Sequence, residues 1–321
     1  MAQIYIAAKL PEVATKQLDE AGISYEMYDK MDTPSQEEII KGIENAEALI
    51  PAVNVPVSEE ALKTNPNLKV IANVGEGYNN IDTKAAKELN IPITNTPTYN
   101  SVASTAELAF ALVLGVSRKL VNGQKMAEAH DFPGWQVMGY LGGDQVSGKT
   151  MAIIGFGKIG SKIGSYAKAF DMNLIYADPF RAPEEVEKEL DAKHVSQEEA
   201  LKTADYVVLM SKYTDENYHM ISKEEIAMMK PSAYLINTGR GKLLNEEALA
   251  DALDAGKLAG AALDVHEFEP KMNDRLTKMS NVLLTPHTGN DTHEARDDMA
   301  AMAVLQAIKA IKGEALDHQV Q

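Results

Sequence analysis

Three charged or titratable residues in the last third of the chain have types suited to orienting a substrate and moving one proton. Arg240 lies in NTGRG, Glu269 in DVHEFEP and His287 in TPHTG, each just after an apolar run. Ligands of open parallel sheets bind outside the carboxyl ends of the strands, so the three side chains can share one crevice. Singly, each has a structural interpretation, as a solvated arginine, a capping glutamate or a hydrogen-bonding histidine. Their common position after strands favours a functional site.

The segment MAIIGFGKIGSKIG carries the spacing G-x-G-x-x-G between an apolar run and a helical one, the context that a dinucleotide-binding loop requires. The first glycine allows a tight turn, the second lets the backbone approach a pyrophosphate, and the third lets helix and strand pack closely. A glycine turn that only packs a helix is the alternative. The residues expected to contact the cofactor are Gly155, Phe156, Gly157, Lys158, Ile159 and Gly160.

Asp178 ends the next apolar run, NLIYAD, 18 residues after Gly160 (178 minus 160). A carboxylate near this spacing binds the ribose hydroxyls and repels a 2′-phosphate, which favours NAD over NADP. Arg181 opposes this preference, because an arginine could bind that phosphate. With a nicotinamide cofactor, the chemistry is hydride transfer.

Composition narrows the classes of partner. The 321 residues include 47 acidic and 31 basic ones, and the net charge of -16 disfavours nucleic acid and anionic membranes. The sequence has no cysteine, which excludes disulfides, thiolate metal sites and a cysteine nucleophile, and no metal is expected. The start, MAQIYIAAKLPEV, has no basic segment before its short apolar run, so a cytoplasmic location is expected.

Short apolar runs alternate with amphipathic stretches along the chain, which predicts parallel sheets covered by helices. One long helix is expected over 101–128, and it is apolar enough through Val116 to be buried between domains or subunits. A last helix is expected over about 292–312. The expected strands are IYIAA, ALIPAV, LKVIAN, IPITN, MAIIGF, NLIYAD, YVVLM, AYLIN, LAGAALDV and VLLTP.

The order of GFGKIG, NTGRG, DVHEFEP and PHTG resembles that of the D-isomer-specific 2-hydroxyacid dehydrogenase family over essentially the whole chain. The segment FPGWQVMGYLGGDQVSGKT most resembles the glyoxylate and hydroxypyruvate reductase branch. The resemblance implies two Rossmann- or flavodoxin-like α/β domains with an active site in the cleft between them. The substrate-binding domain would be discontinuous, residues 1–100 plus 291–321, around an NAD-binding domain of residues 101–290.

The resemblance also implies roles for single residues. Arg240 would bind the substrate carboxylate, His287 would be the general acid and base, and Glu269 would favour the imidazolium form of that histidine. His266 stands where the family usually has an aromatic residue, and we interpret it as a packing variant. Further cofactor contacts are expected from Met210, Ser211, Thr238, Asp264 and Gly289.

On the substrate side, the glycine turn in ANVGEGYNNID would bind the substrate carboxylate through the backbone N–H groups of Glu76 and Gly77. The family usually has a small apolar residue at position 76. An outward Glu76 side chain would leave the turn functional, whereas an inward one would repel the anion. Val53 and Asn54 would approach the substrate side group. Trp135 would either reach the neighbouring subunit's active site or anchor the interface of a homodimer formed through the 101–128 helix.

The resulting hypothesis is an NAD-dependent D-2-hydroxyacid dehydrogenase acting on glyoxylate, hydroxypyruvate or pyruvate, the last giving D-lactate. A D-3-phosphoglycerate dehydrogenase is one alternative, and an NAD-sensing binding protein of the co-repressor type is another. A formate dehydrogenase is disfavoured, because that branch lacks a glutamate partner for its histidine and Glu269 is present.

Overall fold

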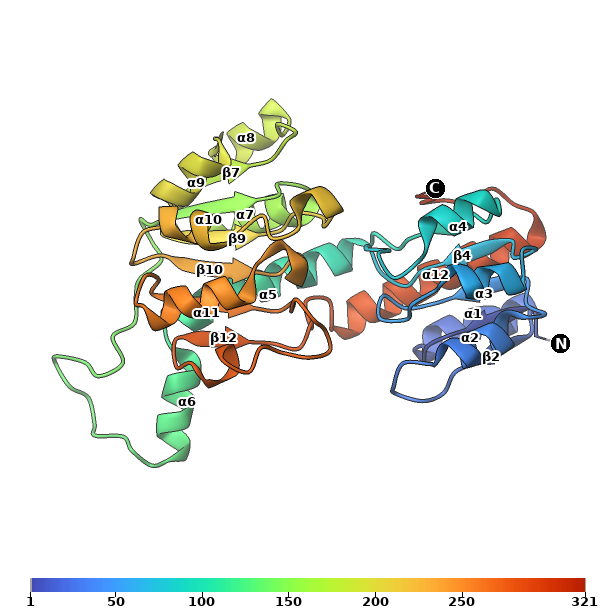
Figure 1. Ribbon diagram of the computed structural model, residues 1–321, viewed down its shortest axis with the longest axis horizontal. Helices are drawn as coiled ribbons and strands as arrows, with labels where there is room; N and C mark the ends of the chain where they lie inside the picture. Colours follow the sequence, from blue (N-terminus) through green and yellow to red (C-terminus); the bar gives the residue numbers. More distant parts are fainter. Residues whose placement is uncertain (1, 321) are drawn as a thin grey trace. The chain divides into compact units, whose positions relative to one another are not determined.

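The computed structural model describes residues 2–320, which form two compact α/β units (Figure 1). One unit is built from the chain up to Ser101 and again from Asn290 onward, and the other from Val102–Gly289. Within the described residues each unit contains one sheet, and all strand pairs in both sheets are parallel. The α/β fold class predicted from the alternating pattern is therefore confirmed.

The first unit is a parallel sheet with helices on both faces. Its strands are β1 Ile4–Ile6, β2 Tyr25–Met27, β3 Ala48–Ile50, β4 Val70–Ala72 and β5 Ile93–Thr94. Its helices are α1 Glu12–Ala21, α2 Gln36–Ile43, α3 Glu59–Thr64, α4 Thr83–Glu88 and α12 His293–Lys312. The strand order β2-β1-β3-β4-β5 is flavodoxin-like. Because side chains alternate along a strand, Ile4 and Ile6 pack with α1 and α12, whereas Tyr5 packs with α2, α3 and α4.

The second unit is a longer parallel sheet of the doubly wound type. Its strands are β6 Thr150–Ile154, β7 Asn173–Ala177, β8 Ala192–His194, β9 Tyr206–Leu209, β10 Tyr234–Asn237, β11 Gly260–Leu263 and β12 Val282–Leu284. Its helices are α5 Tyr99–Ser117, whose residues up to Ser101 belong to the first unit, α6 Leu120–Glu128, α7 Lys158–Ala169, α8 Glu184–Leu190, α9 Gln197–Thr203, α10 Lys223–Met228 and α11 Glu246–Asp254. Met151 and Ile153 face α5 and α7, and Ala152 and Ile154 face α9, α10 and α11.

The strand order in the second unit, β12-β11-β10-β9-β6-β7-β8, places a topological switch point between β6 and β9. From β6 the chain moves outward through β7 and β8, then returns to the other side of β6 and continues from β9 to β12. Loops after β6 and β9 therefore leave the sheet in opposite directions. A crevice at such a point is where open α/β sheets bind ligands.

The helix expected over 101–128 is two helices, so the single-helix prediction is wrong. The Ser117 carbonyl accepts a hydrogen bond from the Asp144 N–H at 2.8 Å instead of continuing the helix, and Lys119 adopts left-handed backbone (φ 51°, ψ 44°). α5 packs apolar residues such as Phe110 and Val113 into the core, whereas α6 buries none of its residues.

Within residues 2–320, α5 is the one helix long and apolar enough to cross a membrane by length and composition. The structure buries 67% of its most apolar 18-residue window, as it would for a core helix of a globular protein. The burial expected from its apolar sequence is thus present in α5.

Candidate active site

The dinucleotide loop follows β6 at the switch point and has the shape that a pyrophosphate requires. Gly155 has a φ of 98°, and a Cβ there would lie 2.5 Å from the Ser211 backbone nitrogen. A Cβ on Gly160 would lie 2.3 Å from the Gly155 carbonyl oxygen, which shows the close contact of helix and strand. A Cβ on Gly157 would meet nothing within 4 Å. The loop is therefore open at the glycine that must let a phosphate approach.

The amino end of α7 supplies the donors at this loop. Gly157 is the N-cap, and no side chain among the described residues caps the helix. The first N–H groups and the positive end of the helix dipole are thus available to an anion. Phe156 is buried and stacks on Tyr176 with ring centroids 4.2 Å apart, Ile159 is half-buried and Lys158 is exposed. These residues fit a bound dinucleotide, which the loop backbone would hold.

Asp178 follows β7 and is turned toward the same loop. Its Oδ2 accepts a hydrogen bond from the Phe156 N–H at 2.8 Å, and its Oδ1 accepts one from the Phe180 N–H at 2.9 Å. These bonds hold the carboxylate at the dinucleotide loop, as expected for a ribose-binding acid. Arg181 is instead turned to Glu187 on α8, with Nε 2.9 Å from Oε1.

Two further strands end at this edge of the sheet. After β9, Met210 is half-buried and the Ser211 hydroxyl donates to the Ile154 carbonyl at 3.1 Å. After β10, the Thr238 hydroxyl is buried and has no hydrogen-bond partner within residues 2–320. A buried hydroxyl without a partner is costly, and a bound polar group such as an amide would remove that cost. Thr238 therefore fits the cofactor contact expected from the sequence.

The structure brings His287 and Glu269 together. His287 Nδ1 lies 2.9 Å from Glu269 Oε2, and the other carboxylate oxygen accepts the His266 N–H at 2.9 Å. Both side chains remain more than a third exposed, so a small substrate can reach them. Burial alone would raise the pKa of Glu269, but the hydrogen bond and charge of His287 outweigh it and lower that pKa below its ordinary value. Glu269 is thus a carboxylate at neutral pH, able to stabilise a protonated imidazole.

Asp264 holds the loop that carries His287. Its buried carboxylate accepts the Thr285 hydroxyl at 2.6 Å, the Thr288 N–H at 2.8 Å and the Gly289 N–H at 2.9 Å. The Asp264 carbonyl accepts the His287 N–H at 2.8 Å. These bonds fix His287 in left-handed backbone, with a φ of 54°. The expected contact of Asp264 and Gly289 with the cofactor stays a prediction, and the role of Asp264 in the loop was not foreseen from the sequence.

His266 is a second residue whose role the sequence did not reveal. Its ring is buried, and Nε2 lies 2.9 Å from the Thr285 carbonyl oxygen, which can only accept, so Nε2 carries the hydrogen. The residue therefore bonds both to the strand end before His287 and, through its N–H, to Glu269. The sequence carries one signal of this role, because His266 is polar and stands where the family usually has an aromatic residue.

Arg240 lies on a turn that is packed against this segment. It follows β10 and precedes the short 3₁₀ helix Gly241–Leu243, and its Nη1 donates to the Gly239 carbonyl at 2.8 Å. A Cβ on Gly241 would lie 1.9 Å from the His266 carbonyl oxygen. Only glycine permits this contact, which places the arginine turn directly beside the segment that carries Glu269.

In the glycine turn of the first unit, residues 75–77, the backbone carbonyls of Glu76 and Gly77 are hydrogen-bonded within the described part of the unit but their N–H groups are not. The Glu76 carbonyl accepts the Asn95 amide at 2.8 Å and the Gly77 carbonyl accepts the Asn73 amide at 2.8 Å. Within residues 2–320, neither the Glu76 N–H nor the Gly77 N–H has a hydrogen-bond partner. Two successive unpaired N–H groups fit the anion-binding turn expected from the sequence.

Val53 lies against this turn, whereas the Asn54 amide does not. Gly75 has a φ of 144°, and a Cβ there would lie 2.2 Å from Val53 Cγ1. The Asn54 amide instead donates to the Thr33 hydroxyl at 3.0 Å. Val53 is therefore placed to limit the size of a group bound at the turn.

An extended arm, residues 129–145, follows α6 (Figure 1) and includes Trp135 in its sequence. The Trp135 side chain is 83% exposed, and that of Met138 is 94% exposed. Phe132 and Val137 on the same arm are also exposed. Exposed apolar segments of this kind are typical of interaction surfaces.

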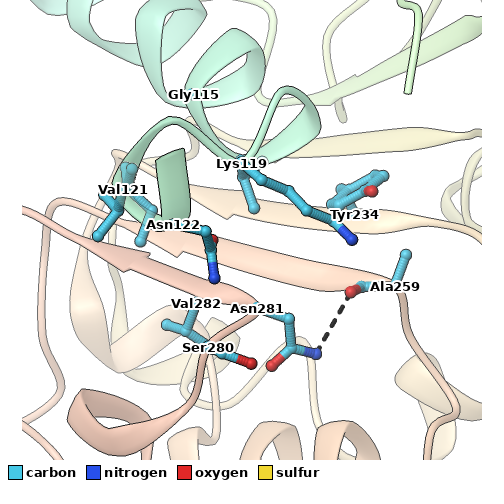
Figure 2. Close-up of a pocket in the computed structure, with 11 residues that line it drawn as sticks. Gly115, Lys119, Val121, Asn122, Tyr234, Ala259, Ser280, Asn281 and Val282 are labelled. Carbon is cyan, nitrogen blue, oxygen red and sulfur yellow. Dashed lines mark hydrogen bonds between the residues drawn. The ribbon is translucent and has the colours of Figure 1, made fainter. Parts of the chain in front are cut away.

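The second unit contains a small cavity, shown in Figure 2, whose lining includes none of the predicted site residues. It is lined by the α5–α6 junction and the amino ends of the last strands, with Lys119 extending toward Tyr234 and the Asn281 amide donating to the Ala259 carbonyl. Its volume is about 20 Å³, room for one water molecule. The predicted site residues of this unit follow the opposite, carboxyl ends of the strands, so this cavity is not the site.

Comparisons with known proteins identify the family that this chain resembles. The model of the D-isomer specific 2-hydroxyacid dehydrogenase NAD binding domain matches residues 110–289. A provisionally named 2-hydroxyacid dehydrogenase of Staphylococcus haemolyticus is 44% identical over 314 residues, which are 98% of both chains. A glyoxylate reductase structure from Paecilomyes thermophila has a TM-score of 0.88 at 29% identity, over 99% of this chain and 97% of that one. A D-lactate dehydrogenase from Aquifex aeolicus, complexed with NAD and lactic acid, has a TM-score of 0.83 at 28% identity, over 97% and 96%.

Proposed function

The chain belongs to the D-isomer-specific 2-hydroxyacid dehydrogenases, which are NAD-dependent oxidoreductases, and on this premise we propose that it interconverts a small 2-oxo acid and its D-2-hydroxy acid. The proposed substrates are glyoxylate, hydroxypyruvate and pyruvate, the last giving D-lactate. The observation that carries the proposal is the His287–Glu269 pair at 2.9 Å, packed beside the Arg240 turn at the carboxyl ends of the strands.

In the proposed reduction each residue has one task. NADH, when bound, supplies the hydride to the carbonyl carbon. The planar Arg240 fork binds the carboxylate and the reacting oxygen, and the N–H groups of Glu76 and Gly77 bind the carboxylate. His287, with Nδ1 on Glu269, gives the proton on Nε2 to the carbonyl oxygen and takes it back in the reverse direction.

The small size of the proposed substrates is supported by the first unit. Val53 lies against the glycine turn of residues 75–77, which would bind the substrate carboxylate. Residues 1–100, which include this turn, contain no arginine that could bind a phosphate on the substrate. The half-exposed Glu76 side chain would further disfavour a second anionic group.

A panel of substrates tests the function. Purified protein is mixed with NADH and each acid in turn, and kcat/KM is measured from the loss of NADH absorbance for the three proposed acids, a longer branched 2-oxo acid and phosphohydroxypyruvate. We expect the highest value for one of the three small acids. A preference for phosphohydroxypyruvate would identify a phosphoglycerate dehydrogenase instead, and no turnover of any acid would favour a binding protein.

Replacing Glu269 with glutamine tests the proton transfer. The variant keeps the side-chain shape and removes a carboxylate whose lowered pKa keeps it ionised at neutral pH. Protonated His287 then lacks its ionic partner, so reduction, which consumes a proton, should weaken more as the pH rises. We expect kcat/KM for reduction to fall about tenfold at mildly alkaline pH and much less at mildly acidic pH. Glu267→Gln is the matched control, because that carboxylate pairs with His219 at 2.7 Å; the same pH profile in wild type and Glu269→Gln would remove Glu269 from this role.

We propose further that the chain forms a homodimer through α5, α6 and the exposed arm. Met138→Asp places a charge in the arm, and we expect sedimentation equilibrium to show a shift from dimer to monomer, with a rise in the dissociation constant of about tenfold or more. Met31→Asp is the control, since Met31 is equally exposed at 90% but lies in the first unit. An unchanged dimer, or a monomeric wild type, would contradict the assignment.

The same experiment distinguishes the two proposed roles of Trp135. If Trp135 reaches the partner subunit's site, Trp135→Ala raises KM while the dimer persists; if it anchors the interface, the dimer weakens.

The absence of cysteine and the burial of α5 support a location in the cytoplasm.

A further inference from the structure

Arg181 is the basic residue closest in sequence to the ribose-binding acid, yet it is held elsewhere. It lies three residues after Asp178, in the segment DPFRAP between β7 and α8. Its Nε lies 2.9 Å from Glu187 Oε1 and its Nη2 lies 2.8 Å from Glu187 Oε2. This bidentate pairing uses the same two donors with which an arginine would bind a phosphate.

Glu187 is itself fixed by a second partner. The Tyr176 hydroxyl donates to Glu187 Oε1, and the same hydroxyl accepts the Ala182 N–H at 2.9 Å. Glu187 is only 8% exposed, which is unusual for a carboxylate on a surface helix. The Arg181 guanidinium, followed by the Tyr176 hydroxyl, lowers the pKa of Glu187 to about 2. The ion pair therefore persists throughout the neutral pH range.

Asp178, in contrast, is held at the cofactor loop. Both of its oxygens accept backbone N–H groups, and its carbonyl lies 3.0 Å from His194 Nε2. A cofactor ribose bound at this loop would meet the carboxylate. The arginine that could neutralise a 2′-phosphate is turned toward α8.

We propose that Glu187 makes the site selective for NAD over NADP by holding Arg181 away from the position of the 2′-phosphate. Selectivity would then have two parts, the repulsion of a 2′-phosphate by Asp178 and the withdrawal of an arginine that could offset this repulsion. The proposal rests on NAD use by the family and is independent of which 2-oxo acid is reduced. Glu187 acts through Arg181 and is thus a positioning residue.

Glu187→Gln tests this directly, because glutamine keeps the shape and removes the charge that binds the guanidinium. Dissociation constants for NADH and NADPH are measured by calorimetry in the absence of substrate. We expect NADPH binding to tighten about tenfold relative to NADH, the size of one charge-assisted hydrogen bond. The same comparison in an Asp178→Asn background, where repulsion is reduced, should show the gain more clearly.

Two controls decide whether the gain comes from Arg181. Adding Arg181→Ala to Glu187→Gln should return the NADPH-to-NADH ratio to that of wild type. Glu247→Gln removes a carboxylate from a different arginine, Arg275, to which it is bonded at 2.9 Å, and should leave the ratio unchanged. A gain that survives in the double variant, or an unchanged ratio in Glu187→Gln, would overturn the proposal.

Arg181→Ala alone provides a second test if Glu187→Gln does not fold. Because the arginine is withheld in the wild type, its removal should leave NADPH affinity unchanged within about twofold. A loss of NADPH affinity of tenfold or more would show that Arg181 already reaches the phosphate, and the proposal would be wrong. Thermal unfolding of each variant separates a change in cofactor selectivity from a change in stability.

Discussion

Replacing His287 with asparagine should lower kcat for reduction by about 10²- to 10⁴-fold, the usual contribution of a general acid. Asparagine tolerates left-handed backbone, so the loop that Asp264 holds should keep its shape while losing a group that can donate a proton at neutral pH. The measurement is kcat at saturating 2-oxo acid, with NADH affinity determined separately by calorimetry. NADH affinity should change little, because the variant removes chemistry and leaves the dinucleotide loop intact.

His318→Asn is the matched control for this experiment. His318 also has a positive φ, 53°, but lies in the C-terminal segment of the first unit, away from the His287 loop in sequence. It should leave kcat unchanged. Retention of more than about a tenth of kcat by His287→Asn would show that another group supplies the proton.

Replacing Arg240 with lysine should lower kcat/KM for 2-oxo acids by about 10²-fold, although the charge is kept. A lysine is a point charge and cannot bind a carboxylate and a carbonyl oxygen with one planar group. Part of the loss should appear in KM, through weaker binding of the carboxylate, and part in kcat, through poorer orientation. The pH profile should keep its shape, because the proton transfer between His287 and the substrate is not altered.

Arg275→Lys is the control for Arg240→Lys. Arg275 bridges Glu247, Asp251 and Asp254 on the surface, and its replacement should affect thermal stability without changing kcat/KM. Equal kcat/KM values for Arg240→Lys and wild type would exclude the proposed role of Arg240 in substrate binding.

The sequence was sufficient for the elements whose signal is local. Apolar runs such as MAIIGF and NLIYAD appear as β6 and β7, because strands buried on both faces are apolar throughout. β2 and β8 lie at sheet edges, and each is three residues long and contains a charged residue, Glu26 in β2 and Lys193 in β8, so neither carries an apolar run to detect. The helix break at Lys119 depends on a hydrogen bond from Asp144, which no local pattern can reveal.

The same division applies to the candidate site. Gly155, Gly157 and Gly160 were identified by spacing, and the strand ends indicated where Arg240 and His287 would lie. The tasks of Asp264 and His266 depend on which groups the fold brings to them: two backbone N–H groups and a hydroxyl for Asp264, and the Thr285 carbonyl for the His266 ring. These hydrogen bonds form only in the folded chain. The sequence could therefore single out Asp264 and His266 but could not predict their hydrogen-bond partners.

The left-handed backbone at His287 sets the stability of this protein against its activity. A residue other than glycine held in a sparsely populated backbone region costs on the order of 1–3 kcal/mol, and here the bonds from Asp264 offset that cost. Selection for heat resistance alone would therefore favour glycine or asparagine at position 287, and on the proposed mechanism the more stable protein would lose most of its turnover. Among relatives, glycine or asparagine at this position would mark chains that kept the cofactor domain after selection for catalysis had ceased.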